Sequence, residues 1–365
     1  MSFSKGFRCL GYFRNLHYRQ GVVNHRFNSS YALAYEVFGE PTEVLKKVPI
    51  QTERHVKGNH VMIKYLASPI NPADINTIQG VYPVKPTSFP VIGGNEGVAE
   101  VIQVGPNVKN IKLGDKVIPS GSTTGTWTTH RVLTEKDLIV LDKNIDTMFA
   151  AQIAVNPCTA YRMMQDFVKL KEGDSIIQNG GNSAVGIYVI QLAKFWNIRS
   201  INVIRDRPDL EQTKEYLKSL GADYVLTEEE IRKRELMDKI FSDISKPKLA
   251  LNCVGGQCAT DCVRHLDDDG TMVTYGGMSK KPVVIPTGSF IFKNHKYVGY
   301  WQTRWNMMNF NSSQRHKMLE ELTELSANKK LITPKVIQVS LDEYKEAIEN
   351  MQKGFSNAKY VFKFD

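Results

Sequence analysis

Glycines between a predicted strand and a predicted helix are the residues most clearly arranged for chemistry in this chain. An apolar run at 175–178 precedes them, an apolar helical pattern covers 184–196, and a second strand-like run follows at 201–204. The glycines are Gly180, Gly181 and Gly186. Glycines in such a turn let the backbone approach a pyrophosphate, and the N–H groups at the helix start bind its charge. The segment therefore predicts a βαβ unit that binds a dinucleotide.

The charged residues after the second predicted strand bear on which dinucleotide is bound. Arg205, Asp206 and Arg207 follow this strand directly. An acid at this place accepts from the ribose 2′-OH of NAD, whereas an arginine accommodates the 2′-phosphate of NADP. Counting about twenty residues from Gly186 selects Arg205 or Asp206, so the spacing leaves both open. Two guanidinium groups against one carboxylate favour NADPH, and the alternative is an exposed Asp–Arg pair of little energetic consequence.

The cysteines indicate a reducing compartment, such as the cytosol or the mitochondrial matrix, and not a disulfide scaffold. They are few and irregularly spaced, at Cys9, Cys158, Cys253, Cys258 and Cys262. Cys253 ends an apolar run and the last two have helical spacing. This pattern favours buried small residues over a metal site, and we expect no metal there.

The net charge of +9 is concentrated at the N-terminus. Basic residues precede Glu36, the first acid, at Lys5, Arg8, Arg14, Arg19 and Arg26. An Arg-rich, acid-free start with interspersed aromatics is typical of a mitochondrial transit peptide, and a disordered basic tail or a nucleic-acid-binding arm is the alternative. The remaining chain has no basic stripe interleaved with aromatics, so we expect no nucleic-acid partner. It also has no apolar run long enough for a membrane span.

The pattern of secondary structure changes along the chain and predicts two domains of an α/β protein. Short strand patterns at 61–67, 98–104 and 116–118 are separated by Gly, Pro and Asn. From about Pro157 strands and helices alternate, with helices predicted at 161–170, 184–196, 210–220 and 259–266. Further strands are expected at 224–226, 249–253, 271–275 and 298–301. Such alternation indicates a doubly wound parallel sheet of the Rossmann type. A helix at 315–326 and a strand at 360–364 would then return to the first domain.

This layout resembles the medium-chain dehydrogenase/reductase superfamily, in which a β-rich, GroES-like catalytic domain is interrupted by a Rossmann domain. The resemblance implies a transit peptide over 1–30, a catalytic domain over 31–156 and 303–365, and a Rossmann NADPH-binding domain over 157–302. Asn71 and Asn95 stand where the zinc alcohol dehydrogenases have a cysteine and a histidine ligand, and the structural zinc lobe of that branch is missing. A catalytic zinc is therefore not expected.

Three linked motifs are similar to those of the mitochondrial trans-2-enoyl thioester reductases: INPADINTIQGVYPVKP at 70–86, IIQNGGNSAVG at 176–186 and VIRDRPD at 203–209. The resemblance extends from about residue 32 to the C-terminus. It implies reduction, with NADPH, of an enoyl thioester carried on acyl-carrier protein or coenzyme A, in the mitochondrial matrix. It also implies a homodimer.

In that family a tyrosine in the matching loop is catalytic, so Tyr82 is the expected catalytic residue. Hydride addition to the β-carbon of an enoyl thioester places negative charge on the carbonyl oxygen. A phenol has an ordinary pKa of about 10, so it can hydrogen-bond that oxygen or protonate the α-carbon, and the sequence leaves both open. The alternative is a turn aromatic that packs before Pro83.

The resemblance also implies which residues contact NADPH. Asn156 would lie near the nicotinamide, with N-capping of a helix before Pro157 as the alternative or additional role. Asn182, Ser183, Ala184 and Val185 occupy the pyrophosphate turn, where Ser183 replaces the usual middle glycine. The other expected contacts are Tyr275, Gly276, Gly277, Met278, Tyr300, Trp301, Gln302 and Lys359. For these, strand-turn glycines, core aromatics and a solvated charge are the alternatives.

Two other functions remain open on the sequence. A zinc-free NADPH quinone or enone reductase would share the cofactor site, and Tyr82 in its GVYP context argues against it. A non-enzymatic nucleotide-binding interaction protein would bind NADPH without turnover. Trp305, Met307, Met308 and Phe310 could line an acyl pocket, with a hydrophobic core or a dimer surface as the favoured explanation.

Overall fold

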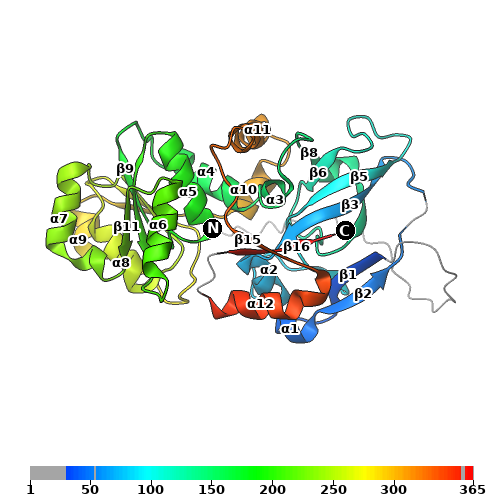
Figure 1. Ribbon diagram of the computed structural model, residues 1–365, viewed down its shortest axis with the longest axis horizontal. Helices are drawn as coiled ribbons and strands as arrows, with labels where there is room; N and C mark the ends of the chain where they lie inside the picture. The colour runs from blue at the N-terminus through cyan, green and yellow to red at the C-terminus, as the bar shows by residue number, and fades with distance from the viewer. Residues whose placement is uncertain (1–29, 53–54, 355–357, 365) are drawn as a thin grey trace, which may run out of the picture.

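The computed structural model describes residues 30–52, 55–354 and 358–364 of the chain. The expected transit peptide at 1–30 lies outside the described residues except for Ser30. The described chain forms two halves side by side, each built around its own sheet (Figure 1).

A six-stranded sheet in the order β11-β10-β9-β12-β13-β14 forms one half, and all of its strands are parallel. Its strands are β9 (Ser175–Asn179), β10 (Arg199–Ile204), β11 (Tyr224–Thr227), β12 (Leu249–Asn252), β13 (Thr271–Thr274) and β14 (Lys296–Gly299). The predicted doubly wound sheet is confirmed, because β9 and β12 pair although two strands separate them along the chain. β9 is buried along its whole length, as expected for a strand covered on both faces.

The helices of this half cover both faces of its sheet (Figure 1). They are α4 (Asn156–Asp166), α5 (Ala184–Phe195), α6 (Leu210–Leu220), α7 (Arg234–Asp243), α8 (Gly256–Arg264) and α9 (Thr287–Ile291). The prediction of a helix at 161–170 was wrong at both ends. Pro157 lies in the first turn, where its missing N–H costs nothing, so the helix begins earlier and has ended before Phe167. The helix α7 was not predicted.

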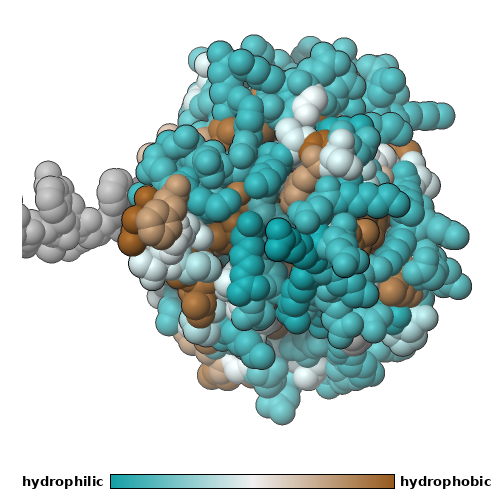
Figure 2. Space-filling model, turned by 90° about the vertical axis from the view of Figure 1, so that its left-hand side faces the viewer, coloured by the Kyte–Doolittle hydropathy of each residue, from teal (hydrophilic) through white to brown (hydrophobic). Residues whose placement is uncertain are grey.

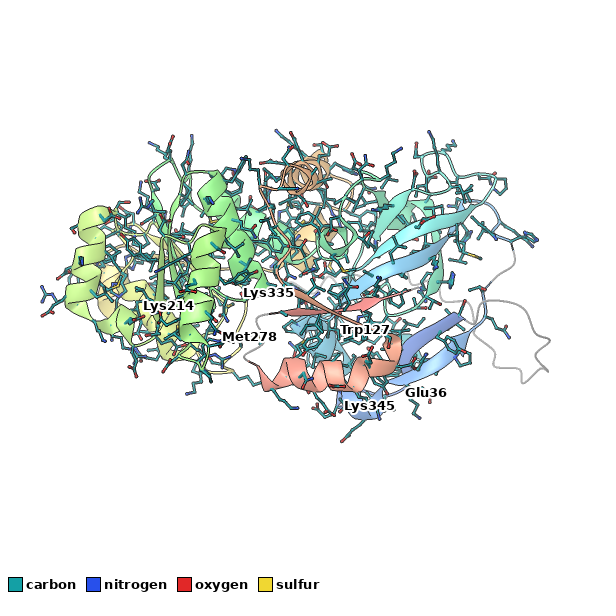
Figure 3. All side chains as sticks on the ribbon, viewed as in Figure 1. Glu36, Trp127, Lys214, Met278, Lys335 and Lys345 are labelled. Atoms are coloured by element: carbon teal, nitrogen blue, oxygen red, sulfur yellow. The ribbon has the colours of Figure 1, made fainter. Side chains whose placement is uncertain are left out.

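The other half is antiparallel except for one pair of strands. Its larger sheet runs β15-β16-β3-β5-β6-β8, with β7 paired to β3, and β15 and β16 are parallel. These strands are β3 (His60–Pro69), β5 (Val98–Val104), β6 (Lys116–Pro119), β7 (His130–Thr134), β8 (Leu138–Val140), β15 (Val336–Val339) and β16 (Lys359–Lys363). A smaller sheet, β2-β1-β4, contains β1 (Ser30–Tyr35), β2 (Lys46–Ile50) and β4 (Val91–Ile92). The buried Trp127 lies in this half, and its ring contacts Phe362 edge-on (Figure 3).

The C-terminal part returns to the antiparallel half, as predicted. β16 pairs with β3, and their register joins Val361 to Pro69. The helices around this half are α1 (Pro41–Val44), α2 (Pro72–Ile78), α3 (Thr147–Ala150), α10 (Gln302–Met308), α11 (Ser313–Ala327) and α12 (Tyr344–Lys353). The helix α11 forms where the sequence predicts a helix, and its Met318 and Leu322 pack in a core shared with Met163 of α4 and Tyr188 of α5. That core also holds Ala67 of β3 and therefore joins the two halves.

No helix in the described ranges is long and apolar enough to cross a bilayer. The outer end of the parallel half is mostly hydrophilic, with apolar residues in separate patches (Figure 2).

Candidate active site

The glycine turn lies between the end of β9 and the start of α5. Gly180 has φ of +63°, a conformation that favours glycine. A Cβ on Gly186 would lie 2.6 Å from the carbonyl oxygen of Gly180, so the helix can approach the turn this closely only without a side chain. Ser183 is the N-cap of α5, and its hydroxyl accepts a hydrogen bond of 3.1 Å from the N–H of Gly186. The replacement of the middle glycine by Ser183 thus supplies a helix cap.

The turn presents an anion-binding helix terminus at the carboxyl edge of the parallel sheet. Asn182, Ala184 and Val185 are partly buried beside Ser183. The N–H groups of the first helical turn carry the positive end of the helix dipole. This arrangement fits the pyrophosphate of a dinucleotide.

The three charged residues after β10 differ in their exposure to solvent. Arg205 and Asp206 are exposed, whereas Arg207 is buried and its guanidinium pairs with Asp209 at 2.5 Å. The N–H of Arg207 also donates to Asp206 at 2.9 Å. Arg205 is therefore the more exposed of the two arginines, and its guanidinium lies near Gly354 of the other half. Asp209, two residues after Arg207, was not predicted as its partner.

Tyr275 and the following residues leave β13 at the same edge of the sheet. The N–H of Tyr275 donates to the carbonyl of Asn252 at 2.9 Å, and Met278 donates to Cys253. Burial raises the pKa of the Tyr275 hydroxyl well above its ordinary value, and this hydroxyl lies beside Cys253 and Ser183. Gly277 and Met278 are exposed, and Met278 lies on the side of the Rossmann half that faces the other half (Figure 3).

Asn156 is the first residue of α4 and lies buried with an unpaired amide. The N-cap position belongs to Val155, so the N-capping alternative for Asn156 was wrong. The side chain of Asn156 is 5% exposed, and its Nδ2 has no hydrogen-bond partner within the described residues. A buried donor without a partner is costly. The amide is therefore available to a bound group.

Tyr82 lies in the loop after α2, and this loop is tied to the helix by its backbone. The N–H groups of Val81 and Tyr82 both donate to the carbonyl of Asn76, at 3.0 and 3.1 Å. Gly80 has φ of +74°, and a Cβ there would lie 2.7 Å from the ring of Phe38. The loop therefore has a defined path that needs glycine before Tyr82.

The hydroxyl of Tyr82 contacts two residues that are distant from it in the sequence. The indole Nε1 of Trp301 donates to this hydroxyl at 2.7 Å, and Thr303 Oγ1 lies 3.3 Å from it. The Tyr82 and Trp301 rings meet edge-on with centroids 5.9 Å apart. Because an indole only donates, the Tyr82 oxygen is the acceptor and its proton points elsewhere. Thr303 was not predicted, and no sequence motif marks it.

Trp301 and its neighbours are positioned by the junction between β14 and α10. Trp301 is the N-cap residue of α10, not the strand residue that the sequence predicted. Tyr300 and Gln302 are buried, and the Tyr300 hydroxyl donates to Oε1 of Gln302 at 2.6 Å. Of the apolar side chains that follow, Met307 and Met308 are exposed, so a hydrophobic core does not explain these two, and the dimer surface stays a prediction. Trp305 packs against the guanidinium of Arg162.

Lys359 belongs to a buried cluster of charges and not to a solvated surface, so that alternative was wrong. Its ammonium donates to Oδ1 of Asn71, whose Nδ2 donates to Glu96 at 2.7 Å. Asn95 Nδ2 donates to Asp74 at 2.6 Å. Burial lowers the pKa of Lys359 to about 8, against the raising effect of Glu96 and Asp74. Burial raises the pKa of Asp74 to about 6 and that of Glu96 above its ordinary value, and the Lys359 ammonium opposes both shifts.

Asn71 and Asn95, which stand where the zinc alcohol dehydrogenases have ligands, are thus hydrogen-bonded to this cluster. Among the described residues, no group of three or more His, Cys, Asp or Glu side chains is placed to hold a metal. Cys253, Cys258 and Cys262 are buried free thiols, as the spacing predicted. Burial raises the pKa of Cys253 to about 11, so this thiol is protonated at neutral pH.

Comparisons with known proteins agree with this geometry. Residues 57–143 match the alcohol dehydrogenase GroES-like domain family, and residues 184–323 match the zinc-binding dehydrogenase family. A mitochondrial enoyl-[acyl-carrier-protein] reductase of Homo sapiens is 46% identical over 330 residues, which are 90% of this chain and 87% of the relative. The mitochondrial enoyl-[acyl-carrier-protein] reductase of Xenopus tropicalis is 44% identical over 342 residues, which are 92% of this chain and 97% of the relative.

Solved structures show the same similarity. The mitochondrial 2-enoyl thioester reductase Etr1p/Etr2p heterodimer from Candida tropicalis superimposes with a TM-score of 0.86 at 38% identity, over 93% of this chain and all of the other. A complex of Etr1p with NADP and crotonyl-CoA has the same TM-score, identity and coverage. A quinone oxidoreductase from Pseudomonas syringae, at 20% identity and a TM-score of 0.76, shares the fold. The chain belongs to the mitochondrial enoyl-[acyl-carrier-protein] reductase family of the medium-chain dehydrogenase/reductase superfamily.

Proposed function

We propose that this protein reduces trans-2-enoyl thioesters to saturated acyl thioesters with NADPH, as a step of mitochondrial fatty acid synthesis. The observation that carries the proposal is the Tyr82 hydroxyl, whose oxygen is occupied by the indole N–H of Trp301. This leaves the phenolic proton for an acceptor outside that pair, and a substrate carbonyl is such an acceptor. The relatives named for this reaction and Etr1p, solved with NADP and crotonyl-CoA, support it.

The residues present fit NADPH. Gly180 and Gly186 leave room for the pyrophosphate turn, and the start of α5 supplies N–H donors to its charge. Arg205 is the expected partner of the 2′-phosphate, because it is exposed after β10, whereas Arg207 is buried against Asp209. Asp206, which follows Arg205, is an exposed carboxylate next to that guanidinium. We assign Asn182, Ser183, Ala184 and Val185 to the pyrophosphate.

Residues at the junction of the two halves would hold the nicotinamide end. The unpaired amide of Asn156 fits a polar group of the cofactor, because binding would satisfy its buried Nδ2. Further contacts are assigned to Tyr275, Gly276, Gly277, Met278, Tyr300, Trp301, Gln302 and Lys359. The catalytic domain is assigned to 31–156 and 303–365 and the Rossmann domain to 157–302.

In the reaction, NADPH when bound supplies hydride to the β-carbon of the thioester. Negative charge then develops on the thioester carbonyl oxygen, and a donor aimed at this oxygen stabilises the charge. Tyr82 is that donor, and addition of a proton to the α-carbon then completes the saturated thioester. The N–H of Trp301 stabilises negative charge on the Tyr82 oxygen while the phenol shares its proton. Thr303 Oγ1, 3.3 Å away, holds the hydroxyl from a second side.

Acyl-carrier protein or coenzyme A is the proposed carrier of the substrate, and the mitochondrial matrix is the proposed location. The names of the relatives support both the carrier protein and the organelle. The basic, acid-free segment before Glu36 supports import as a transit peptide.

A homodimer is the proposed assembly, and the edge of the parallel sheet is its proposed interface. β14 pairs only with β13 in the described part of the chain, so its other edge is unpaired. Val298 is 38% exposed, and Phe290, Ile291 and Phe292 beside the strand are also exposed. An unpaired strand edge with exposed apolar neighbours can pair with the same edge of a second copy of the chain. Val298→Lys should convert the dimer to a monomer in light scattering, and an unchanged mass would reject this interface.

The experiment that tests the function compares oxidants. Purified protein should oxidise NADPH rapidly with crotonyl-CoA and slowly with a simple quinone, and enoyl thioesters of several lengths would show the chain-length preference. A faster reaction with the quinone would favour the quinone reductase alternative. Tight NADPH binding without turnover of either oxidant would favour the non-enzymatic alternative.

A further inference from the structure

A charged cluster lies behind the proposed nicotinamide end, and one of its members has no role in the reaction described so far. Glu96 is 2% exposed and lies between β4 and β5. Its Oε1 accepts from Nδ2 of Asn71 at 2.7 Å. Its Oε2 is buried without a hydrogen-bond partner at normal distance among the described residues, although the backbone N–H of Val155 faces the carboxylate. Burying an incompletely hydrogen-bonded carboxylate destabilises the fold, and a nearby opposite charge offsets this cost.

The opposite charge is the ammonium of Lys359. It comes from β16, at the other end of the chain, and donates to Oδ1 of the same Asn71. Asn71 thus bridges Glu96 and Lys359 with its two amide atoms. Asp74, 1% exposed, also faces Lys359 and holds the backbone N–H of Asn71 at 2.7 Å.

Two elements of the proposed cofactor site therefore meet at Glu96. One is β16 with Lys359, and the other is the start of α4, where Val155 precedes Asn156. We propose that Glu96 is a positioning residue of the reduction, which through Asn71 and Lys359 keeps the Lys359 ammonium charged and oriented toward the nicotinamide end. This inference rests on the proposed contact of Lys359 with NADPH.

Of the other groups that face this pair, Asp74 has a pKa that burial raises to about 6, so it is mostly ionised at neutral pH. The charge of Glu96 also raises the pKa values of Cys158 of α4 and Tyr188 of α5. Burial raises the pKa of Cys158 to about 12 and that of Tyr188 well above its ordinary value, so both stay neutral. The charges that act on Lys359 are those of Glu96 and Asp74.

The sign of the expected pH effect follows from these charges. Burial lowers the pKa of Lys359, and the carboxylates oppose that shift. In Glu96→Gln the side chain can still accept from Asn71, but the charge is gone, so the pKa of Lys359 should fall further. NADPH binding that needs the ammonium would then be lost at lower pH than in the wild type.

The test measures the dissociation constant of NADPH by its fluorescence, and kcat with crotonyl-CoA, as functions of pH. In Glu96→Gln the alkaline limb of both profiles should move to lower pH by about one unit, and NADPH affinity above neutral pH should fall about tenfold. Glu96→Asp, which keeps the charge, should retain the wild-type limb. Glu100→Gln, an exposed glutamate of β5, is the matched control and should leave both profiles unchanged.

A double variant distinguishes positioning from a general structural role. If Glu96 acts through Lys359, Glu96→Gln should add little to the effect of Lys359→Met. The inference would be overturned if the pH profiles of Glu96→Gln superimposed on those of the wild type. It would also be overturned if Glu96→Gln lowered NADPH affinity and kcat equally at every pH and this loss added fully to that of Lys359→Met. If Glu96→Gln fails to fold, the other two variants decide. An alkaline limb that is kept in Glu96→Asp and lost in Lys359→Met supports the proposal. A wild-type pH profile in Lys359→Met overturns the proposal. A wild-type protein that binds no NADPH would instead reject the proposed function.

Discussion

The indole Nε1 of Trp301 donates a hydrogen bond of 2.7 Å to the hydroxyl of Tyr82, across 219 positions of the chain. This contact joins the loop after α2 to the start of α10. It fixes the acceptor role of the phenol oxygen, because an indole has no acceptor.

Trp301→Phe should lower kcat with crotonyl-CoA roughly tenfold, the effect of losing one hydrogen bond to a group that gains charge in the transition state. The phenyl ring keeps most of the edge-on contact with Tyr82, so the fold should be retained. Steady-state kinetics check this prediction. Trp196→Phe, which alters a tryptophan at the end of α5, is the control and should leave kcat unchanged.

Arg205→Ala should weaken NADPH binding roughly 10- to 100-fold and leave NADH binding almost unchanged, because the lost contact is to the 2′-phosphate. Titration of both cofactors by fluorescence measures this difference. Arg234→Ala removes an exposed guanidinium of α7 and should affect neither cofactor. Equal losses for NADH and NADPH would remove Arg205 from the 2′-phosphate site.

Gly186→Ala should weaken NADPH binding and lower the free energy of unfolding by about 1–3 kcal/mol. The new Cβ would lie 2.6 Å from the carbonyl oxygen of Gly180, so the turn and the helix must separate. Thermal and urea unfolding measure the stability. Gly121→Ala is the matched control, since its Cβ would meet nothing within 4 Å, and equal stability of the two variants would contradict the packing argument.

The Rossmann half could be predicted from sequence because its signals are local. The strand–glycine–helix pattern at 175–196 requires only neighbouring residues, and β9 and α5 lie where that pattern placed them. The boundaries of α4 were wrong because a helical pattern alone does not locate a first turn, although Pro157 was its marker.

The parts of the site that could not be predicted depend on long-range pairing. Nothing near Tyr82 in the sequence indicates Thr303, and nothing near Lys359 indicates that Asn71 and Glu96 surround its ammonium. These contacts arise when β16 pairs with β3 and when α10 begins beside the Tyr82 loop. A lysine that looks solvated in the sequence is therefore enclosed by carboxylates in the fold.

Tyr82→Phe removes only the phenolic hydroxyl and keeps the ring beside Trp301. If Tyr82 is the catalytic donor, kcat with crotonyl-CoA should fall roughly 100-fold while the dissociation constant of NADPH stays within about twofold of the wild type. Tyr31→Phe, which removes a hydroxyl from β1, should leave both quantities unchanged. An unchanged kcat in Tyr82→Phe would contradict the assignment of Tyr82 as the catalytic donor.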